Sequence, residues 1–330
     1  GGLAFRKATP KGLHAPKVPY GEKDKRYRLE RLLEAEAGAR IAPAIKQVEA
    51  SLLEWEEEVL VANTEGVFAE EKRVRTRLFV LAVAQDGAEV QTGYSAPGKS
   101  VGLELFDLYP PKAVGEKAAR QALTNLKARP APAGTFPVVV GPGFGGVLFH
   151  EAVGHLLETT SVARKASVLA DKLGEVVASP AVTYIDDGTL PHAWGSTEMD
   201  DEGRPTERTV LIEKGVLKSY MVDRLGHLLT GYPMTGSGRR QDYTFAPTSR
   251  MRNTFLAPGE ARVEDLFAGI AFGLYAKEMG GGQVKPGSGE YNFAVQEGYI
   301  IRKGRIEEPV RGAMLVGKGP ETLMRVVAVA

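Results

Sequence analysis

The sequence predicts an α+β protein, with an α/β domain over residues 1–130 and a β-rich domain over residues 131–330. Three observations support this prediction. Helical periodicity changes to period-two alternation near residue 56, the Pro/Gly-rich stretch "RPAPAGT" occupies residues 129–135, and strand–turn–strand patterns dominate after residue 180. The length of 330 residues is sufficient for two ordinary domains.

The first domain is expected to combine helices with an antiparallel meander. Residues 1–20 are rich in Gly, Pro and Lys and predict loop or extended chain. Apolar residues at helical spacing predict a helix over residues 22–40, and Pro43 suits the first turn of a second helix over residues 41–55. The expected helices are 22–40, 41–55 and 113–128, and the expected strands are 56–66, 73–87 and 88–96.

The second domain is expected to begin at residues 136–146 with a short buried strand that runs into a glycine loop, and the loop leads into a helix over residues 147–158. Beyond it, turn dipeptides such as KG and DG separate alternating segments. The expected strand regions are 181–189, 208–222 and 290–315, and the expected short helices are 222–231, 262–270 and 320–329.

Composition restricts the class of protein and its partners. Hydrophobic residues make up 43% and charged residues 25%, which predicts a globular chain. The net charge of +1 and the lack of any Lys/Arg-rich block argue against a nucleic-acid partner. No apolar run approaches the ~18 residues of a membrane span, so we expect no membrane partner and a cytoplasmic location. Cysteine is absent, which excludes disulfides and cysteine-ligated zinc within these residues.

The stretch "HEAVGH" carries the strongest chemical signal, with His150, Glu151 and His155 in close sequence proximity. Zinc peptidases of the H-E-x-x-H type place two histidines four residues apart on one helical face. Residues five apart on a regular α-helix are instead separated by about 140°. We therefore expect a widened turn, such as a π-bulge, around Gly154 to bring the two rings together.

If the two histidines hold Zn²⁺, the chemistry is hydrolysis. Glu151 then activates the zinc-bound water as nucleophile and passes its proton to the leaving amine. The alternative is that His150 and His155 are satisfied residues of a buried helix, because the stretch is rich in Val and Leu.

Several blocks of the chain closely resemble the TldD/PmbA family, in its TldD-type branch that bears H-E-x-x-x-H. They include "PVVVGPGFGGVLFHEAVGHLLE", "GSTEMDDEGRPTERTVLIEKGVLKSYMVDRLGHLLTG" and "GSGRRQDYTFAPTSRMRNTFLAPG". The resemblance is dense over residues 130–325 and looser over residues 40–130. It implies a β-rich C-terminal domain particular to the family, and a zinc-dependent peptidase that hydrolyses small or unfolded peptides with low sequence specificity. By matching position, His150 and His155 become zinc ligands and Glu151 the catalytic base.

The resemblance also implies assembly. Members form homodimers, or heterodimers with a TldE/PmbA-type subunit, and enclose the metal between subunits. The third zinc ligand of the family is a Cys in a later glycine-rich segment, whereas this chain has no Cys. We therefore expect the sequence to be incomplete at both ends. A non-catalytic binding or scaffold member that acts through a partner subunit is the alternative function.

Two further motifs are candidates for substrate binding. Arg239, Arg240 and Asn253 lie in "GSGRR" and "RMRNT" and are candidates to hold a substrate carbonyl or oxyanion. Gly281 and Gly282 lie in "GGGQV", where a strand edge would let a substrate backbone approach. Turn and loop roles are the equally weighted alternative for both motifs.

Overall fold

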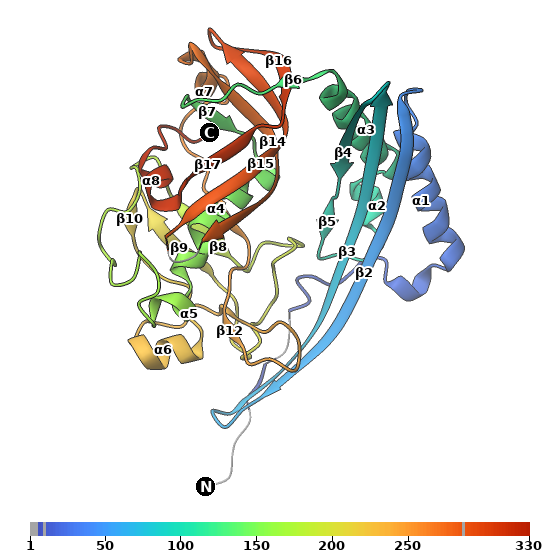
Figure 1. Ribbon diagram of the computed structural model, residues 1–330. Helices are drawn as coiled ribbons and strands as arrows, with labels where there is room; N and C mark the ends of the chain where they lie inside the picture. Colours follow the sequence, from blue (N-terminus) through green and yellow to red (C-terminus); the bar gives the residue numbers. More distant parts are fainter. Residues whose placement is uncertain (1–5, 9–10, 286–287) are drawn as a thin grey trace.

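The computed structural model describes residues 6–8, 11–285 and 288–330 of the protein, so part of the loop predicted at 1–20 lies outside the described residues. The elements of the first half are β1 Arg6–Ala8, a 3₁₀ turn Tyr20–Glu22, α1 Lys25–Ala39, β2 Ile45–Ala62, β3 Val67–Asp86, β4 Glu89–Ser95, β5 Gly98–Lys99, α2 Leu105–Leu108 and α3 Pro111–Lys127. The long antiparallel pair β2–β3 forms the centre of a sheet, to which β4 and β5 add antiparallel and β1 parallel, all on β3. Helices α1 and α3 lie against this sheet (Figure 1).

The predicted helices at 22–40 and 113–128 correspond to α1 and α3, and the predicted meander corresponds to β2, β3 and β4. The helix predicted at 41–55 is wrong, because this stretch forms most of β2. Val48, Ala50 and Leu52 pack against the core in alternation, while every second residue faces solvent. Pairing with β3 thus overrides the helix propensity of this stretch.

The two long helices approach each other closely through glycine. A Cβ atom at Gly115 would lie 1.9 Å from the carbonyl oxygen of Ala35, and one at Gly38 would lie 2.2 Å from that of Lys112. The absent side chains let α1 and α3 pack in one layer on the sheet.

The second half, as predicted, is β-rich. Its elements are β6 Arg129–Pro130, β7 Val138–Val140, a 3₁₀ turn Gly143–Gly146, α4 Val147–Ala152, a 3₁₀ turn Gly154–Leu157, α5 Thr159–Val162, β8 Tyr184–Asp187, β9 Arg208–Glu213, β10 Val216–Leu217, α6 Arg224–Thr230, β11 Gly238–Arg239, β12 Thr248–Ser249, β13 Thr254–Leu256, α7 Asp265–Ala268, β14 Phe272–Lys285, β15 Glu290–Arg302, β16 Arg305–Arg311, β17 Met314–Lys318 and α8 Gly319–Met324. One sheet runs β6-β16-β15-β14-β7 with β17 on β15, and a second runs β10-β9-β8-β13. The predicted short helices appear as α6, α7 and α8, and the strand and glycine loop predicted at 136–146 appear as β7 and the 3₁₀ turn after it. The expected burial of this strand is wrong, because its residues are exposed or half-buried.

Each half of the chain has its own cluster of buried hydrophobic residues. Ala35, Leu78 and Leu105 belong to the first, between the β2–β3 sheet and its helices. The second contains residues of α4, β8, β14 and β15, and α4 packs directly against β14 and β15. The boundary near residue 130 remains a prediction. None of the helices in the described part of the chain has the length and apolar content needed to span a bilayer.

Buried charges join the β2–β3 hairpin to the second half. The guanidinium of Arg73 donates to Asp201 at 2.6 Å, to Glu71 at 3.0 Å and to the carbonyl of Met199 at 3.0 Å. The side chains of Arg73, Glu71 and Asp201 are all less than a tenth exposed. Because a buried charge is tolerated only when paired, this network specifies where the hairpin meets the loop that carries Asp201.

Candidate metal centre

The segment that carries the two histidines starts at a strand end and continues through a glycine turn. Strand β7 pairs parallel with β14, and the chain then turns at Gly143, whose φ is +74°. Helix α4 follows, with Leu148 and Ala152 buried on its inner side. His150 and Glu151 lie on the half-buried side. This strand–loop–helix order confirms the local arrangement expected from the sequence.

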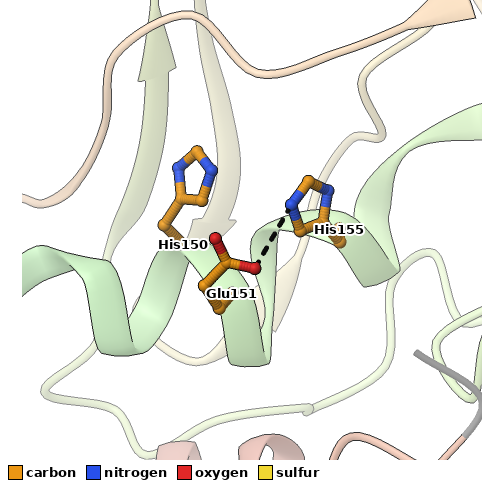
Figure 2. A group of neighbouring side chains, drawn as sticks. All are labelled: His150, Glu151 and His155. Carbon is orange, nitrogen blue, oxygen red and sulfur yellow. Dashed lines mark ion pairs between the residues drawn. The ribbon is translucent and has the colours of Figure 1, made fainter. Parts of the chain in front are cut away.

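The helix predicted at 147–158 is interrupted, and the interruption is not a π-bulge. Helix α4 ends at Ala152, Val153 adopts φ −133° and ψ −44°, and a 3₁₀ turn follows from Gly154 to Leu157. The break nevertheless puts both imidazoles on one side of the segment, as Figure 2 shows. Their ring centroids are 5.3 Å apart and the ring planes are nearly perpendicular at 85°. The predicted convergence is confirmed, but the widened turn that was expected to produce it is wrong.

Gly154 has a different role from the one expected. Its φ is not positive, so backbone freedom is not the reason for glycine. A Cβ atom at this position would lie 2.2 Å from Sδ of Met251 and 3.1 Å from the hydroxyl of Tyr184. Glycine at this position therefore allows the segment to pack closely against Met251 and Tyr184.

His150, Glu151 and His155 form the only group of three or more His, Asp or Glu residues within the described ranges whose ligand atoms all lie within 4.8 Å of one another. Nε2 of His155 is 3.5 Å from a carboxylate oxygen of Glu151. Two imidazole nitrogens and a carboxylate are donors that suit Zn²⁺ and related divalent metals. The donor set therefore fits a divalent metal ion.

Each histidine is held at Nδ1 by a partner that the sequence analysis missed. Nδ1 of His150 is 3.1 Å from Oγ1 of Thr254. Nδ1 of His155 is 3.1 Å from Oε2 of Glu158, and the guanidinium of Arg250 donates to the same oxygen at 3.1 Å. Glu158 follows His155 by three residues and could have been suspected on that spacing, whereas nothing in the sequence connects Thr254 to His150.

The two imidazoles have different electrostatic environments. The pKa of His150 is lowered to about 4, mainly by burial and also by the charges of His155 and Arg239. Burial acts to lower the pKa of His155 as well, but the hydrogen bond and charge of Glu158 and the charge of Glu151 outweigh it, so this pKa is raised. His150 is thus neutral near pH 7, which is the form that binds a metal.

Asp186, on strand β8, is another group whose pKa is shifted. In the β8–β13 pair, Thr254 lies opposite Asp186. Burial raises the pKa of Asp186 to about 7, against the opposing hydrogen bond from the backbone of Arg252. That bond joins the Arg252 N–H to Oδ1 of Asp186 at 2.7 Å.

Three of the candidate substrate-binding residues, Arg239, Arg240 and Asn253, form hydrogen bonds with different parts of the protein. The exposed Arg239 donates to the carbonyl of Met251 at 3.3 Å and is close enough to lower the pKa of His150. Arg240 is bound to Asp201 through its backbone N–H at 2.8 Å and its guanidinium at 3.0 Å. The amide of Asn253 bonds the N–H of Gly195, the carbonyl of Asp187 and the hydroxyl of Ser196.

Gly281 and Gly282 lie in β14 at an irregular stretch of its pairing with β15. Gly282 pairs with Phe293, and a Cβ atom there would meet the backbone of Asn292. Gly281 has open space on the side where a Cβ would lie. No described hydrogen bond or ion pair joins either glycine to the histidines, and the substrate role of all five candidate residues stays a prediction.

Comparison with known proteins identifies the family. Residues 133–330 match the domain described as the PmbA/TldA metallopeptidase C-terminal domain, and residues 17–126 match the corresponding central domain. The chain is 39% identical to the metalloprotease TldD homolog of Haemophilus influenzae, over 99% of this chain and 69% of that protein. It is 32% identical to the zinc metalloprotease TldD homolog of Saccharolobus solfataricus, over 74% of this chain and 55% of that protein.

A solved structure shows the same fold. The crystal structure of TldE from Thermococcus kodakarensis superimposes with a TM-score of 0.78 and 20% sequence identity, covering 95% of this chain and 71% of that one. Two domain matches in order, together with close relatives over nearly the whole chain, show that the protein belongs to the PmbA/TldD family of metallopeptidases.

Proposed function

We propose that this protein is a zinc-dependent peptidase whose centre is formed by His150, Glu151 and His155. The observation that carries the proposal is the convergence of two imidazoles and a carboxylate within 4.8 Å despite a five-residue spacing. The name of the Saccharolobus relative as a zinc metalloprotease supports zinc as the metal. A catalytic zinc normally keeps three protein ligands, so the proposal requires one ligand in addition to the two histidines.

The three residues of the proposed centre would have different roles. His150 and His155 would hold the metal through Nε2, because their Nδ1 atoms face Thr254 and Glu158. A bound Zn²⁺ would supply Lewis-acid activation of a water molecule and of the scissile carbonyl. Glu151, between the two rings, would accept the proton of the attacking water and deliver it to the leaving amine.

We further propose that the substrates are short or unfolded peptides and that a second subunit encloses the site. The partner would be another copy of this chain or a TldE/PmbA-type subunit, and the likeness to TldE supports this choice. His155 and Glu151 retain 28% and 32% exposure of their side chains, so an extended peptide can reach them. Location in the cytoplasm and a domain division near residue 130 belong to the same proposal.

Metal analysis of the full-length protein, with peptide hydrolysis measured with and without a chelator, tests this function. Glu151→Gln should retain metal and lose ~10²–10⁴-fold in activity, because it deletes the base and leaves the ligands. Glu213→Gln, at an exposed position on β9, is the matched control and should retain activity. Chelator-resistant hydrolysis, or a fully active Glu151→Gln variant, would contradict the proposal.

A further inference from the structure

We propose that residues 248–254 are the positioning element of the metal centre, with Thr254 orienting His150 directly and Arg250 orienting His155 through Glu158. We call these residues the positioning segment. The inference rests on the proposed peptidase function and assigns a role to the "RMRNT" motif other than substrate binding.

The contact to His155 runs through two charged groups. Oε2 of Glu158 lies 3.1 Å from Nδ1 of His155 and accepts a hydrogen bond from Arg250 at 3.1 Å. The Glu158 side chain is only 3% exposed, and its other oxygen has no hydrogen-bond partner among the described residues. Its orientation therefore depends on these two contacts, and Arg250 holds the carboxylate that faces the ring.

The contact to His150 comes from the other end of the segment. Oγ1 of Thr254 lies 3.1 Å from Nδ1 of His150. Thr254 begins β13, whose pairing with the buried strand β8 fixes its backbone. The neighbouring strand also holds the helix itself, since the hydroxyl of Tyr184 donates to the carbonyl of Phe149 at 3.3 Å.

The middle of the positioning segment packs against the chain where the helix is interrupted between the two histidines. Met251, only 2% exposed, occupies the space beside Gly154 that a side chain would need. Oγ of Ser249 accepts a hydrogen bond from the Thr160 N–H at 2.8 Å. One short segment thus contacts the helix before the break, the break itself and the helix after it.

This arrangement has a direct consequence for metal binding. Ligating histidines generally use their second ring nitrogen to bond an outer partner, which fixes the tautomer and the ring direction. Here both Nδ1 atoms are engaged by outer partners, which would leave both Nε2 atoms available to hold one ion. Loss of such a partner typically costs ~10–100-fold in metal affinity or activity.

The test is Zn²⁺ affinity of the full-length protein, measured by competition with a chromophoric chelator, together with the visible spectrum of the Co²⁺ form. Thr254→Val and Glu158→Gln should each weaken Zn²⁺ binding ~10–100-fold and alter the Co²⁺ spectrum. Thr254→Ser keeps the hydroxyl and should restore wild-type affinity. The melting temperature of the metal-free protein identifies any variant that loses affinity because it no longer folds.

The matched controls remove contacts in which neither histidine takes part. Thr322→Val removes a hydroxyl that bonds Tyr291 at 2.9 Å, and Glu297→Gln neutralises a buried carboxylate paired with Lys277 at 2.7 Å. Both should bind Zn²⁺ as the wild type does. If Thr254→Val and Glu158→Gln bind within twofold of these controls, the positioning role is refuted while the metal site stands. If Glu158→Gln does not fold, equal affinities of Thr254→Val and Thr254→Ser refute it. If the wild-type protein binds no metal, the proposed function itself fails.

Discussion

Replacing Gly154 with alanine would place a methyl carbon 2.2 Å from Sδ of Met251 and 3.1 Å from the hydroxyl oxygen of Tyr184. Both neighbours are buried, with 2% and 1% exposure, so neither can swing into solvent. The expected result is a strained core directly before His155, because the packed interior resists added volume.

The magnitude follows from two opposing effects. Replacing glycine by alanine gains ~0.4–1 kcal/mol through the unfolded state, whereas forcing a methyl group into a packed core costs ~1–3 kcal/mol. Since the overlap with Met251 is severe, we expect the packing cost to exceed the gain by ~1–2 kcal/mol. For a protein of this size each kcal/mol lowers the melting temperature by ~2–4 °C.

Gly146→Ala is the matched control. Gly146 has φ −60° and ψ −18°, and nothing lies within 4 Å of the position of its Cβ. Alanine there should stabilise by ~0.4–1 kcal/mol through the unfolded state. Thermal unfolding followed by circular dichroism measures both variants, and Zn²⁺ titration should show weakened binding only for Gly154→Ala. If Gly154→Ala melts at or above the temperature of Gly146→Ala, the packing argument for the break is incorrect.

Three further outcomes are expected. Asp186→Asn should gain stability relative to wild type as pH rises from about 4 to 7, and this gain should stay constant at higher pH. The folded-state pKa of about 7 exceeds the unfolded value, so ionised Asp186 destabilises the folded protein at high pH, whereas asparagine does not. Urea unfolding at pH 5 and pH 8 should show that the unfolding free energy of the variant relative to wild type increases by on the order of 1–4 kcal/mol between the two pH values. Arg73→Ala should cost ~3–5 kcal/mol in urea unfolding, because it leaves Glu71 and Asp201 buried without their cation; a change below 1 kcal/mol would contradict the buried network. Light scattering of the full-length protein, alone or with a TldE/PmbA-type subunit, should show a dimer that cuts denatured chains faster than folded ones, and an active monomer would rule out the enclosed site.

The sequence predicted the fold class well because most elements follow their local pattern, and it failed at β2 for a physical reason. The stretch 41–55 contains Glu, Leu, Ala and Lys, which favour helices in isolation. Its alternating Val48, Ala50 and Leu52 were the correct signal, yet short alternation also fits a helical face. Only the partner strand β3, which lies further along the chain, decides between the two.

The sequence indicated the three side chains that converge at the candidate site, but not the residues that contact them from elsewhere in the chain. The motif itself names His150, Glu151 and His155, and their convergence could be argued from helix geometry. Thr254 and Arg250 could not be inferred, because strand pairing and chain folding bring them to the histidines from about a hundred residues away. The nature of the break depended on Met251, whose packing against Gly154 no periodicity reveals.

The distance along the chain between the histidines and the positioning segment affects how the site forms during synthesis. His150 and His155 leave the ribosome well before Thr254, which is 104 residues beyond His150. At ~5–20 residues per second the nascent chain spends roughly 5–20 seconds with both imidazoles present and no segment to orient them. A newly made chain therefore carries both imidazoles before the strand that contacts them is present, and the proposed centre would form only when this later strand folds back onto them.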